Sequence, residues 1–347
     1  MALHKSALLM TSKLISFCIP TYNRPDTLCM TLSSILTQEE KCPYEIVISD
    51  NSETDETATL MKTFRGNSKI RYYRNSTNIG SAANFTKVIS LATGRYVWLM
   101  SDDDCLHTGA LSRMTNLLSR EPNLVYIFAS RLLCDSDLNP IAGFLQPEGV
   151  HKDIIYKAGK DLFSAFNGQM AMLVGFISST IIRKDIWDEN FKLVGEPLGN
   201  WSHARVILHA IIDKPCAVLD GENVLARLAP IEDGIKSAIW LDQGVELMKL
   251  AEQWGYDSQL CRNLIAYCFY NYAKMFVLDK ALGRRSDNLY SLAKRLECKN
   301  YIRINWIWFI MSFFPRSVLW PIPWINNKRR RILGYVNRKL VKSNADV

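Results

Sequence analysis

Strand-like apolar runs alternate with helix-like segments along the first 130 residues of the chain. The apolar runs are short and are bounded by Pro, Gly, Asn and Asp, which is typical of buried strands. The pattern predicts strands over 14–20, 44–49, 70–74, 96–100 and 124–129, and helices over 25–38, 55–65, 81–91 and 109–118. Pro25 suits the first turn of its helix, because a backbone N–H is not needed there.

Alternating strands and helices with short connections predict an α/β fold, with a mostly parallel sheet flanked by helices on both faces. In such sheets the active site lies at the carboxyl ends of the strands. Three polar clusters occupy such ends, over 21–24, 50–52 and 101–104. Their agreement in position predicts a functional site at this edge.

The middle of the chain, 130–227, is less regular. We expect a strand over 176–183, a helix over 201–212, and a strand over 217–226 with a turn at Asp220-Gly221. From 232 to 296 apolar residues recur at three- and four-residue spacing, which is typical of helices. A boundary near Ala229-Pro230 is expected, with a catalytic domain over 1–229 and a helical C-terminal domain over 230–347.

Composition agrees with a globular protein: 347 residues, 48% of them hydrophobic, are enough for two domains. The sequence contains no run of 18 apolar residues, so it predicts no transmembrane helix. The first residues lack the pattern of a secretory signal. The nine cysteines are scattered without a Cys-x-x-Cys pair. Reduced thiols in a cytosolic protein are therefore expected.

The net charge of +8 is concentrated at the C-terminus, where the residues from 315 onward contain eight basic side chains and one acidic side chain. An apolar, aromatic segment over 304–314 comes before them. Tryptophans near cations favour a membrane interface, so we expect the C-terminal region to associate with a membrane surface. The alternative is a hydrophobic helix packed on the catalytic domain, followed by a solvated basic tail. The tryptophans are Trp306, Trp308, Trp320 and Trp324, and the cations begin with Lys328, Arg329, Arg330 and Arg331.

The acidic run Asp102, Asp103, Asp104 directly follows the apolar run 96–99. Carboxylates packed this closely at a strand end repel one another, and a bound cation relieves the repulsion. The cation would in turn hold a phosphate-bearing ligand. The alternative is an acidic turn that caps the helix over 109–118.

Other phosphate-binding and nucleophilic motifs are absent from the sequence. The turn after the first strand, 20–24, has no glycine, which argues against a nicotinamide enzyme, and no Gly-Lys-Ser/Thr loop occurs. No Ser or Cys stands in a nucleophile elbow. A metal at the acidic run would then be the main means of neutralising phosphate.

Four motifs together resemble glycosyltransferase family 2, whose members have the GT-A fold. They are Ile-Ser-Phe-Cys-Ile-Pro-Thr-Tyr-Asn-Arg over 15–24, Glu-Ile-Val-Ile-Ser-Asp-Asn-Ser over 45–52, Asn78-Ile-Gly80 with Asn84, and the acidic run. They appear in the family's order over the first 120 residues. Within the family the chain is most similar to the abequosyltransferases of O-antigen assembly, on the first motif, the Ser-Asp-Asp-Asp run, and Gly195 followed by His203.

The resemblance implies roles for the residues at matching positions. Asp50 would accept a hydrogen bond from the base, with Asn51 and Ser52 nearby, although a helix cap or turn former would also explain Asp50. The nucleotide pocket would be lined by Pro20, Thr21, Tyr22 and Arg24, and the wall near the ribose and diphosphate would be formed by Asn78, Gly80 and Asn84. Gly80 also suits a tight turn before the helix.

The family's metal motif is usually Asp-x-Asp, and here Ser101 stands at the first Asp and Asp103 at the second. The resemblance implies that Asp103 binds Mg²⁺ or Mn²⁺, and that Asp102 or Asp104 contacts the sugar or ribose. The metal would bridge the donor's phosphates and stabilise the leaving diphosphate.

Inverting members of the family use a carboxylate from the middle segment as the base for the acceptor hydroxyl. The usual Glu-Asp pair is not visible here. Glu196 and Asp188 are candidates, and His203 is another, although a lone His is more often structural. An abequosyltransferase would retain the configuration of the sugar, and the leaving phosphate itself could then take the proton.

The resemblance implies a peripheral enzyme on the cytoplasmic face of the bacterial inner membrane. It would transfer a 3,6-dideoxyhexose, abequose from CDP-abequose, to an oligosaccharide on a polyprenyl diphosphate. Nucleic acid is not expected as a partner. The alternative within the family is a hexosyl- or rhamnosyltransferase that uses a UDP- or dTDP-sugar. Two other classes fit the sequence less well. A sugar-nucleotide pyrophosphorylase would need a Gly-rich basic loop after the first strand, and this chain has none there. A non-catalytic binding module would leave the three strand-end clusters unexplained.

Overall fold

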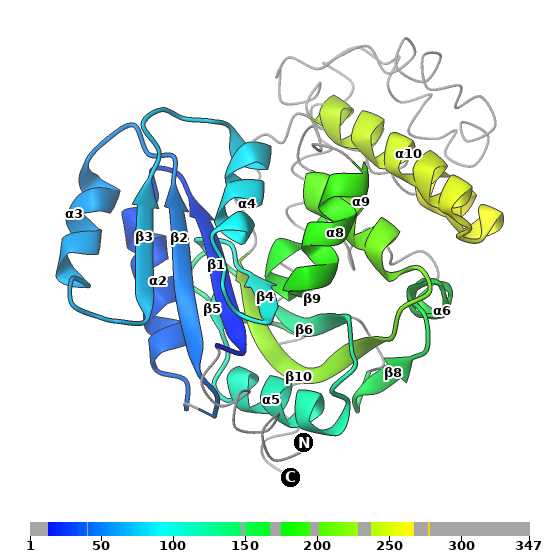
Figure 1. The fold of residues 1–347 in the computed structure, drawn as a ribbon, viewed down its shortest axis with the longest axis horizontal. Helices are drawn as coiled ribbons and strands as arrows, with labels where there is room; N and C mark the ends of the chain where they lie inside the picture. Colours follow the sequence, from blue (N-terminus) through cyan, green and yellow to red (C-terminus); the bar gives the residue numbers. More distant parts are fainter. Residues whose placement is uncertain are drawn as a thin grey trace. The chain divides into compact units, whose positions relative to one another are not determined.

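The computed structural model describes residues 13–39, 41–146, 150–166, 175–194, 201–227, 237–266 and 277 (Figure 1). They fall into two compact units. The first takes in 1–140 and 145–228 and contains the sheet except for residues 141–144 of the strand over 140–146, and the second takes in 141–144 and 229–347. The second unit includes the helix α10 (Ser237–Trp254).

Four parallel strands form one half of the sheet, in the order β3-β2-β1-β4. Their register pairs Thr21 with Asp50 and Asp50 with Arg74, so their carboxyl ends meet at one edge, as predicted. The central strands are buried throughout, whereas β3 at the edge is only half-buried. The bounds are β1 Ile15–Thr21, β2 Tyr44–Asp50, β3 Ile70–Arg74 and β4 Tyr96–Leu99.

Helices connect these strands and cover both faces of the sheet, which confirms the predicted α/β class. The pleat of β1 separates the faces: Phe17 belongs to the core that α2 and α5 close, while the Cys18 thiol donates to the carbonyl of Val88 on α4, 3.7 Å away. The helices are α2 Pro25–Leu36, α3 Glu56–Thr63, α4 Ser81–Ser90 and α5 Ala110–Arg120. Each lies within three residues of its predicted bounds.

The second half of the sheet is mixed. Strand β9 is antiparallel to both β4 and β6, and β10 is parallel to β6. The bounds of the strands are β5 Cys105–Leu106, β6 Tyr126–Cys134, β7 Pro140–Gln146, β8 Ile154–Tyr156, β9 Thr180–Arg183 and β10 Cys216–Arg227. The helices here are α6 Gly159–Ala165, α8 Lys184–Val194 and α9 Ser202–Ile211.

Two local predictions in this half are wrong. The expected turn at Asp220-Gly221 is a register shift within the continuous strand β10, and Gly221 has a φ of 88° there. The expected strand over 176–183 begins with the short 3₁₀ helix η1 (Ile177–Ser179), and only β9 is extended. The turn of η1 matters for the site, because it places Ile177 and Ser178 beside the acidic run.

Trp98 anchors the acidic run to the core. Its side chain is fully buried, its ring lies 5.4 Å from that of Phe17, and its indole N–H donates to the carbonyl of Ser178 at 2.9 Å. The strand before the carboxylates is thus held by packing and by a hydrogen bond to η1.

Of the predictions on composition, two concern the described residues. The seven cysteines among them are all free thiols. None of the helices in the described ranges is long and apolar enough to cross a membrane. The tryptophan-rich and basic C-terminal region lies outside the described residues.

Candidate active site

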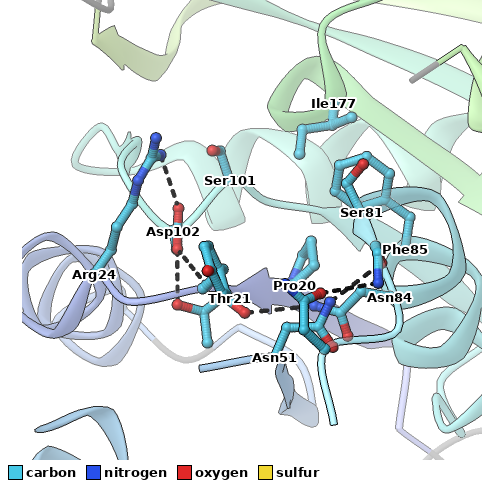
Figure 2. Close-up of a pocket in the computed structure, with 13 residues that line it drawn as sticks. Pro20, Thr21, Arg24, Asn51, Ser81, Asn84, Phe85, Ser101, Asp102 and Ile177 are labelled. Carbon is cyan, nitrogen blue, oxygen red and sulfur yellow. Dashed lines mark hydrogen bonds and ion pairs between the residues drawn. The ribbon is translucent and has the colours of Figure 1, made fainter. Parts of the chain in front are cut away.

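A cavity of about 300 Å³ opens at the predicted edge of the sheet, beyond the carboxyl ends of β1, β2 and β4 and beside the start of α4 (Figure 2). Nine of the residues named from sequence line it: Pro20, Thr21, Tyr22, Arg24, Asn51, Asn78, Gly80, Asn84 and Asp102. Ser81, Phe85, Ser101 and Ile177 complete the lining. Five segments that are separate in the sequence, 20–24, 51, 78–85, 101–102 and 177, therefore converge on one cavity.

The turn after β1 is fixed to the loop after β2. Asn23 has a left-handed φ of 53°, its backbone N–H donates to the Ser52 hydroxyl at 2.8 Å, and its side-chain oxygen accepts from the Glu53 N–H at 3.2 Å. Asparagine tolerates this conformation better than most residues. The turn needs Asn23 for its shape, so the side chains of Thr21, Tyr22 and Arg24 are held toward the cavity.

Asp102 is the carboxylate that lines the cavity. It accepts hydrogen bonds from the Thr21 hydroxyl at 2.7 Å and the Tyr22 N–H at 3.4 Å, and it pairs with Arg24 at 3.4 Å. Burial raises the pKa of Asp102 to about 6, against the opposing effects of the Thr21 hydrogen bond and the Arg24 charge. Asp103 is more accessible: it pairs with Arg24 at 3.0 Å and accepts the Ser101 hydroxyl.

Asp104 lies beneath the loop and does not line the cavity. Its carboxylate accepts the Ser178 hydroxyl and the backbone N–H of Arg227, the latter at 2.9 Å. Complete burial, and then the neighbouring charge of Asp103, raise the pKa of Asp104 to about 7. The Ser178 hydroxyl also accepts from the Ser101 N–H at 2.9 Å, so Asp104 and Ser178 support the loop from within the protein.

Asp50 is also turned away from the cavity lining. Its carboxylate is fully buried and accepts the Ser52 N–H at 2.7 Å and the Tyr72 hydroxyl at 2.6 Å. The first contact is that of a turn former, which is the alternative stated for Asp50 from sequence. The predicted hydrogen bond between Asp50 and the base of the nucleotide would require the Ser52 N–H or the Tyr72 hydroxyl to share the carboxylate with it.

Asn75 was not predicted from the sequence, although it organises the wall of the cavity. Its side-chain N–H₂ donates to the oxygens of Asn51 at 2.6 Å and Asn84 at 3.1 Å, and its own oxygen accepts from Lys87. Asn51 then donates to the carbonyl of Gly80 at 3.1 Å. Because Asn75 can only donate to both neighbours, it fixes which way their amides point.

The segment 78–80 shapes the entrance to α4. The Asn78 side-chain oxygen accepts the Gly80 N–H at 2.9 Å, and Gly80 has a φ of 85°. A side chain at Gly80 would meet no atom within 4 Å, so the positive φ, not a lack of space, explains the glycine. The tight turn suggested for Gly80 from sequence is confirmed.

Two candidates for a base from the middle segment, Asp188 and His203, do not line the cavity. Asp188 pairs with Lys184 on α8. His203 is buried on α9, and its ring packs edge-on against Phe85 with centroids 6.0 Å apart, so it lies one layer behind the lining. Glu196 lies outside the described residues.

The acidic loop has the chemistry that a hard dication requires. In the part of the chain that the structure describes, no three His, Cys, Asp or Glu side chains form a metal cluster. Mg²⁺, however, is usually held by only one or two carboxylates together with substrate phosphates. Asp102 and Asp103 already share a cation, the guanidinium of Arg24. These two carboxylates therefore fit a dication that a phosphate ligand helps to bind.

The chain is similar in sequence to known proteins. The family model described as glycosyl transferase family 2 matches residues 16–165. The chain is 34% identical to abequosyltransferase RfbV of Salmonella typhimurium over 60% of this chain and 67% of that protein. It is 27% identical to the GalNAc(5)-diNAcBac-PP-undecaprenol beta-1,3-glucosyltransferase of Campylobacter jejuni, over 45% of this chain and 49% of the other.

A solved structure shares the fold. The fragment 1–349 of S. aureus TarS, in complex with UDP-GlcNAc, matches with a TM-score of 0.54 over 94% of this chain and 92% of that one. The sequence identity is 14%, so this likeness supports the fold alone.

Proposed function

The chain belongs to glycosyltransferase family 2, and on that premise we propose that it transfers a sugar from a nucleoside diphosphate to an oligosaccharide on a polyprenyl diphosphate. The observation that carries the proposal is the cavity itself, which joins Asp102 of the acidic loop to the first turn of α4. The Campylobacter jejuni relative favours this class of acceptor, because its name gives an oligosaccharide on an undecaprenyl diphosphate.

The cavity offers two kinds of contact to a diphosphate. Gly80 and Ser81 begin α4, and the N–H groups at a helix N-terminus attract phosphate. On the other side, Asp103, supported by Asp102, would hold Mg²⁺ or Mn²⁺, which supplies Lewis-acid stabilisation of a leaving diphosphate when bound. Figure 2 shows Arg24 and Asp102 on one side of the cavity, and Ser81, in the first turn of α4, with Phe85 on the other.

For the sugar we propose a 3,6-dideoxyhexose, abequose donated by CDP-abequose. Phe85 and Ile177 give the cavity an apolar wall. A methyl or methylene edge of a deoxysugar would pack there without loss, whereas a hydroxyl would lose its hydrogen bonds to water. The resemblance to RfbV favours the same sugar. A hexosyl- or rhamnosyltransferase that uses a UDP- or dTDP-sugar is the alternative.

Two groups could accept the proton that the acceptor hydroxyl loses during transfer. If the configuration is retained, the leaving phosphate accepts the proton, and no separate base is needed. If it is inverted, a carboxylate must approach the acceptor, and Glu196 is the candidate for this base. His203 would act in either case through Phe85, by holding the apolar wall in place.

Binding of nucleotides to the full chain tests the proposed function. We expect CDP with Mn²⁺ to raise the melting temperature by on the order of 5 °C at about 100 times its Kd, and UDP, GDP and dTDP to raise it less. Inorganic phosphate with Mn²⁺ is the control. A larger shift with UDP or dTDP would favour the alternative donors, and no shift with any nucleotide would contradict the proposal.

We also propose that the C-terminal region holds the enzyme on the cytoplasmic face of the inner membrane, as a peripheral protein. Four consecutive cations beside four tryptophans have the chemistry of a headgroup interface. In the full chain, replacing Lys328, Arg329, Arg330 and Arg331 by Gln is expected to abolish sedimentation with anionic vesicles at about 0.1 M salt. Equal sedimentation of the variant and the original chain would show that these cations do not anchor it.

A further inference from the structure

Arg24 lies where Asp102 and Asp103 of the acidic loop can both reach it, and Figure 2 shows its contact with Asp102. Its guanidinium is 3.0 Å from Asp103 and 3.4 Å from Asp102, through the same nitrogen, Nη1. The side chain of Arg24 is 48% exposed, while those of Asp102 and Asp103 are 7% and 23% exposed. The cation is thus the most accessible member of the group.

The two contacts of Arg24 differ in how firmly the carboxylate is held. Asp102 is fixed by the Thr21 hydroxyl and the Tyr22 N–H, whereas Asp103 accepts the hydroxyl of Ser101, two residues before it in the same loop. The backbone of Arg24 is anchored at the start of α2, where its carbonyl accepts the Leu28 N–H at 3.1 Å. The guanidinium can therefore move while the backbone stays in place, and an ion pair this exposed is weak.

The contact with Asp103 occupies the carboxylate proposed for the dication. If Asp103 kept the guanidinium and also bound a dication, two cations would share one carboxylate, and their repulsion would weaken the binding of both. Arginine has another use in this cavity, because its planar fork matches the oxygens of a phosphate. A diphosphate would therefore draw Arg24 away from Asp103.

We infer that Arg24 couples the dication to the nucleotide: it withholds Asp103 from a dication until a diphosphate takes over the guanidinium. This inference rests on the proposed function of the same cavity. Its consequence is that each ligand strengthens the binding of the other, and by thermodynamic linkage the factor is the same in both directions.

The test measures Mn²⁺ binding to the full chain by electron paramagnetic resonance of the free ion, with and without saturating CDP. In the original chain CDP is expected to lower the Kd for Mn²⁺ by roughly 30-fold or more. Arg24→Gln is expected to bind Mn²⁺ alone about 3- to 10-fold more tightly, and to lose most of the effect of CDP. Arg120→Gln is the matched control, because Arg120 is an exposed arginine that pairs with Asp153 on the surface.

A second variant separates charge from shape. Arg24→Lys keeps the competing cation but loses the fork, so we expect it to bind Mn²⁺ alone as the original chain does, and to respond less to CDP. If Arg24→Gln fails to fold, as its circular dichroism would show, Arg24→Lys still decides: an unchanged response to CDP would overturn the role of the fork.

The outcomes distinguish this inference from the proposed function. If the original chain binds neither Mn²⁺ nor any nucleoside diphosphate, the proposed function and the coupling by Arg24 are both wrong. If it binds both ligands, but Arg24→Gln binds Mn²⁺ alone no more tightly than the original chain, the proposed function stands and the coupling by Arg24 is wrong.

Discussion

Replacing Asp103 by Asn is expected to lower kcat for sugar transfer by about 10³-fold or more, a change of roughly 4 kcal/mol in the barrier, and to leave the melting temperature unchanged. The amide keeps the shape of the carboxylate and can still accept the Ser101 hydroxyl, so little stability depends on the charge. The charge is what a dication at this loop would need. Initial rates with purified donor and acceptor, together with thermal unfolding, provide the measurement.

Two other variants make the result specific to Asp103. Asp137→Asn changes an exposed carboxylate in the turn between β6 and β7 and is expected to leave the rate unchanged. Asp104→Asn keeps one oxygen, which can still accept the Arg227 N–H, and its amide nitrogen can donate to the Ser178 hydroxyl, so its effect on the rate is expected to be much smaller than that of Asp103→Asn. Transfer by Asp103→Asn at more than a tenth of the original rate would contradict our assignment of the metal ligand.

The cavity could be predicted from the sequence because parallel strands bring their carboxyl ends together. Each of the clusters at 21–24, 50–52 and 101–104 follows a strand with clear bounds, and residues from all three line the cavity. Asn75 follows β3 in the same way, so the same rule could have found it. It was overlooked because a single asparagine after an edge strand also suits an ordinary turn.

The direction of each side chain could not be predicted in this way. Asp102, Asp103 and Asp104 are consecutive, yet the first lines the cavity, the second is partly exposed, and the third is buried beneath the loop. The difference depends on Ser178 and Arg227, which lie 74 and 123 residues from Asp104 along the chain. Only the tertiary fold brings them to the loop.

The mixed half of the sheet was also difficult to predict, because several of its strands are short. Strands β5 and β8 have two and three residues, too few to show a period. In β10 the polar residues at the register shift, around Asp220-Gly221, suggested a turn, although the strand continues through them. Pairing with β6 on both sides of the shift keeps it extended.

Replacing Glu45 by Ala is expected to lower the free energy of unfolding by about 2–4 kcal/mol at pH 7. Glu45 lies in the central strand β2 with a fully buried carboxylate. One oxygen accepts the Ser16 hydroxyl and both the N–H and hydroxyl of Thr93, each at 2.7 Å. The other accepts Lys13 at 2.6 Å and Arg71 at 3.0 Å. Alanine would leave these donors without their acceptor.

Urea denaturation measures this loss, and Glu39→Ala is the matched control. Glu39 is an exposed glutamate paired with Lys41 on the surface, so its replacement is expected to cost less than about 1 kcal/mol. Equal losses for the two variants would show that the network around Glu45 contributes no more to stability than a surface ion pair.

The dependence on pH separates the charge of Glu45 from its packing. Burial alone would raise the pKa of Glu45, but the hydrogen bonds from Lys13, Ser16 and Thr93 outweigh it and lower the pKa to about 2, from an ordinary 4.5. The stabilisation is therefore complete above pH 4.5 and is lost as the pH falls toward 2.

The buried carboxylates of the acidic loop act in the opposite sense. The pKa values of Asp102 and Asp104 are raised to about 6 and about 7, so these groups favour the folded state more as the pH falls from 7 toward 4. Both groups are present in the original chain and in Glu45→Ala, and their effect cancels in the difference between the two. The difference in unfolding free energy should then be constant from pH 7 to pH 5 and shrink between pH 4.5 and pH 2. A difference that stays constant down to pH 2 would assign the loss to packing.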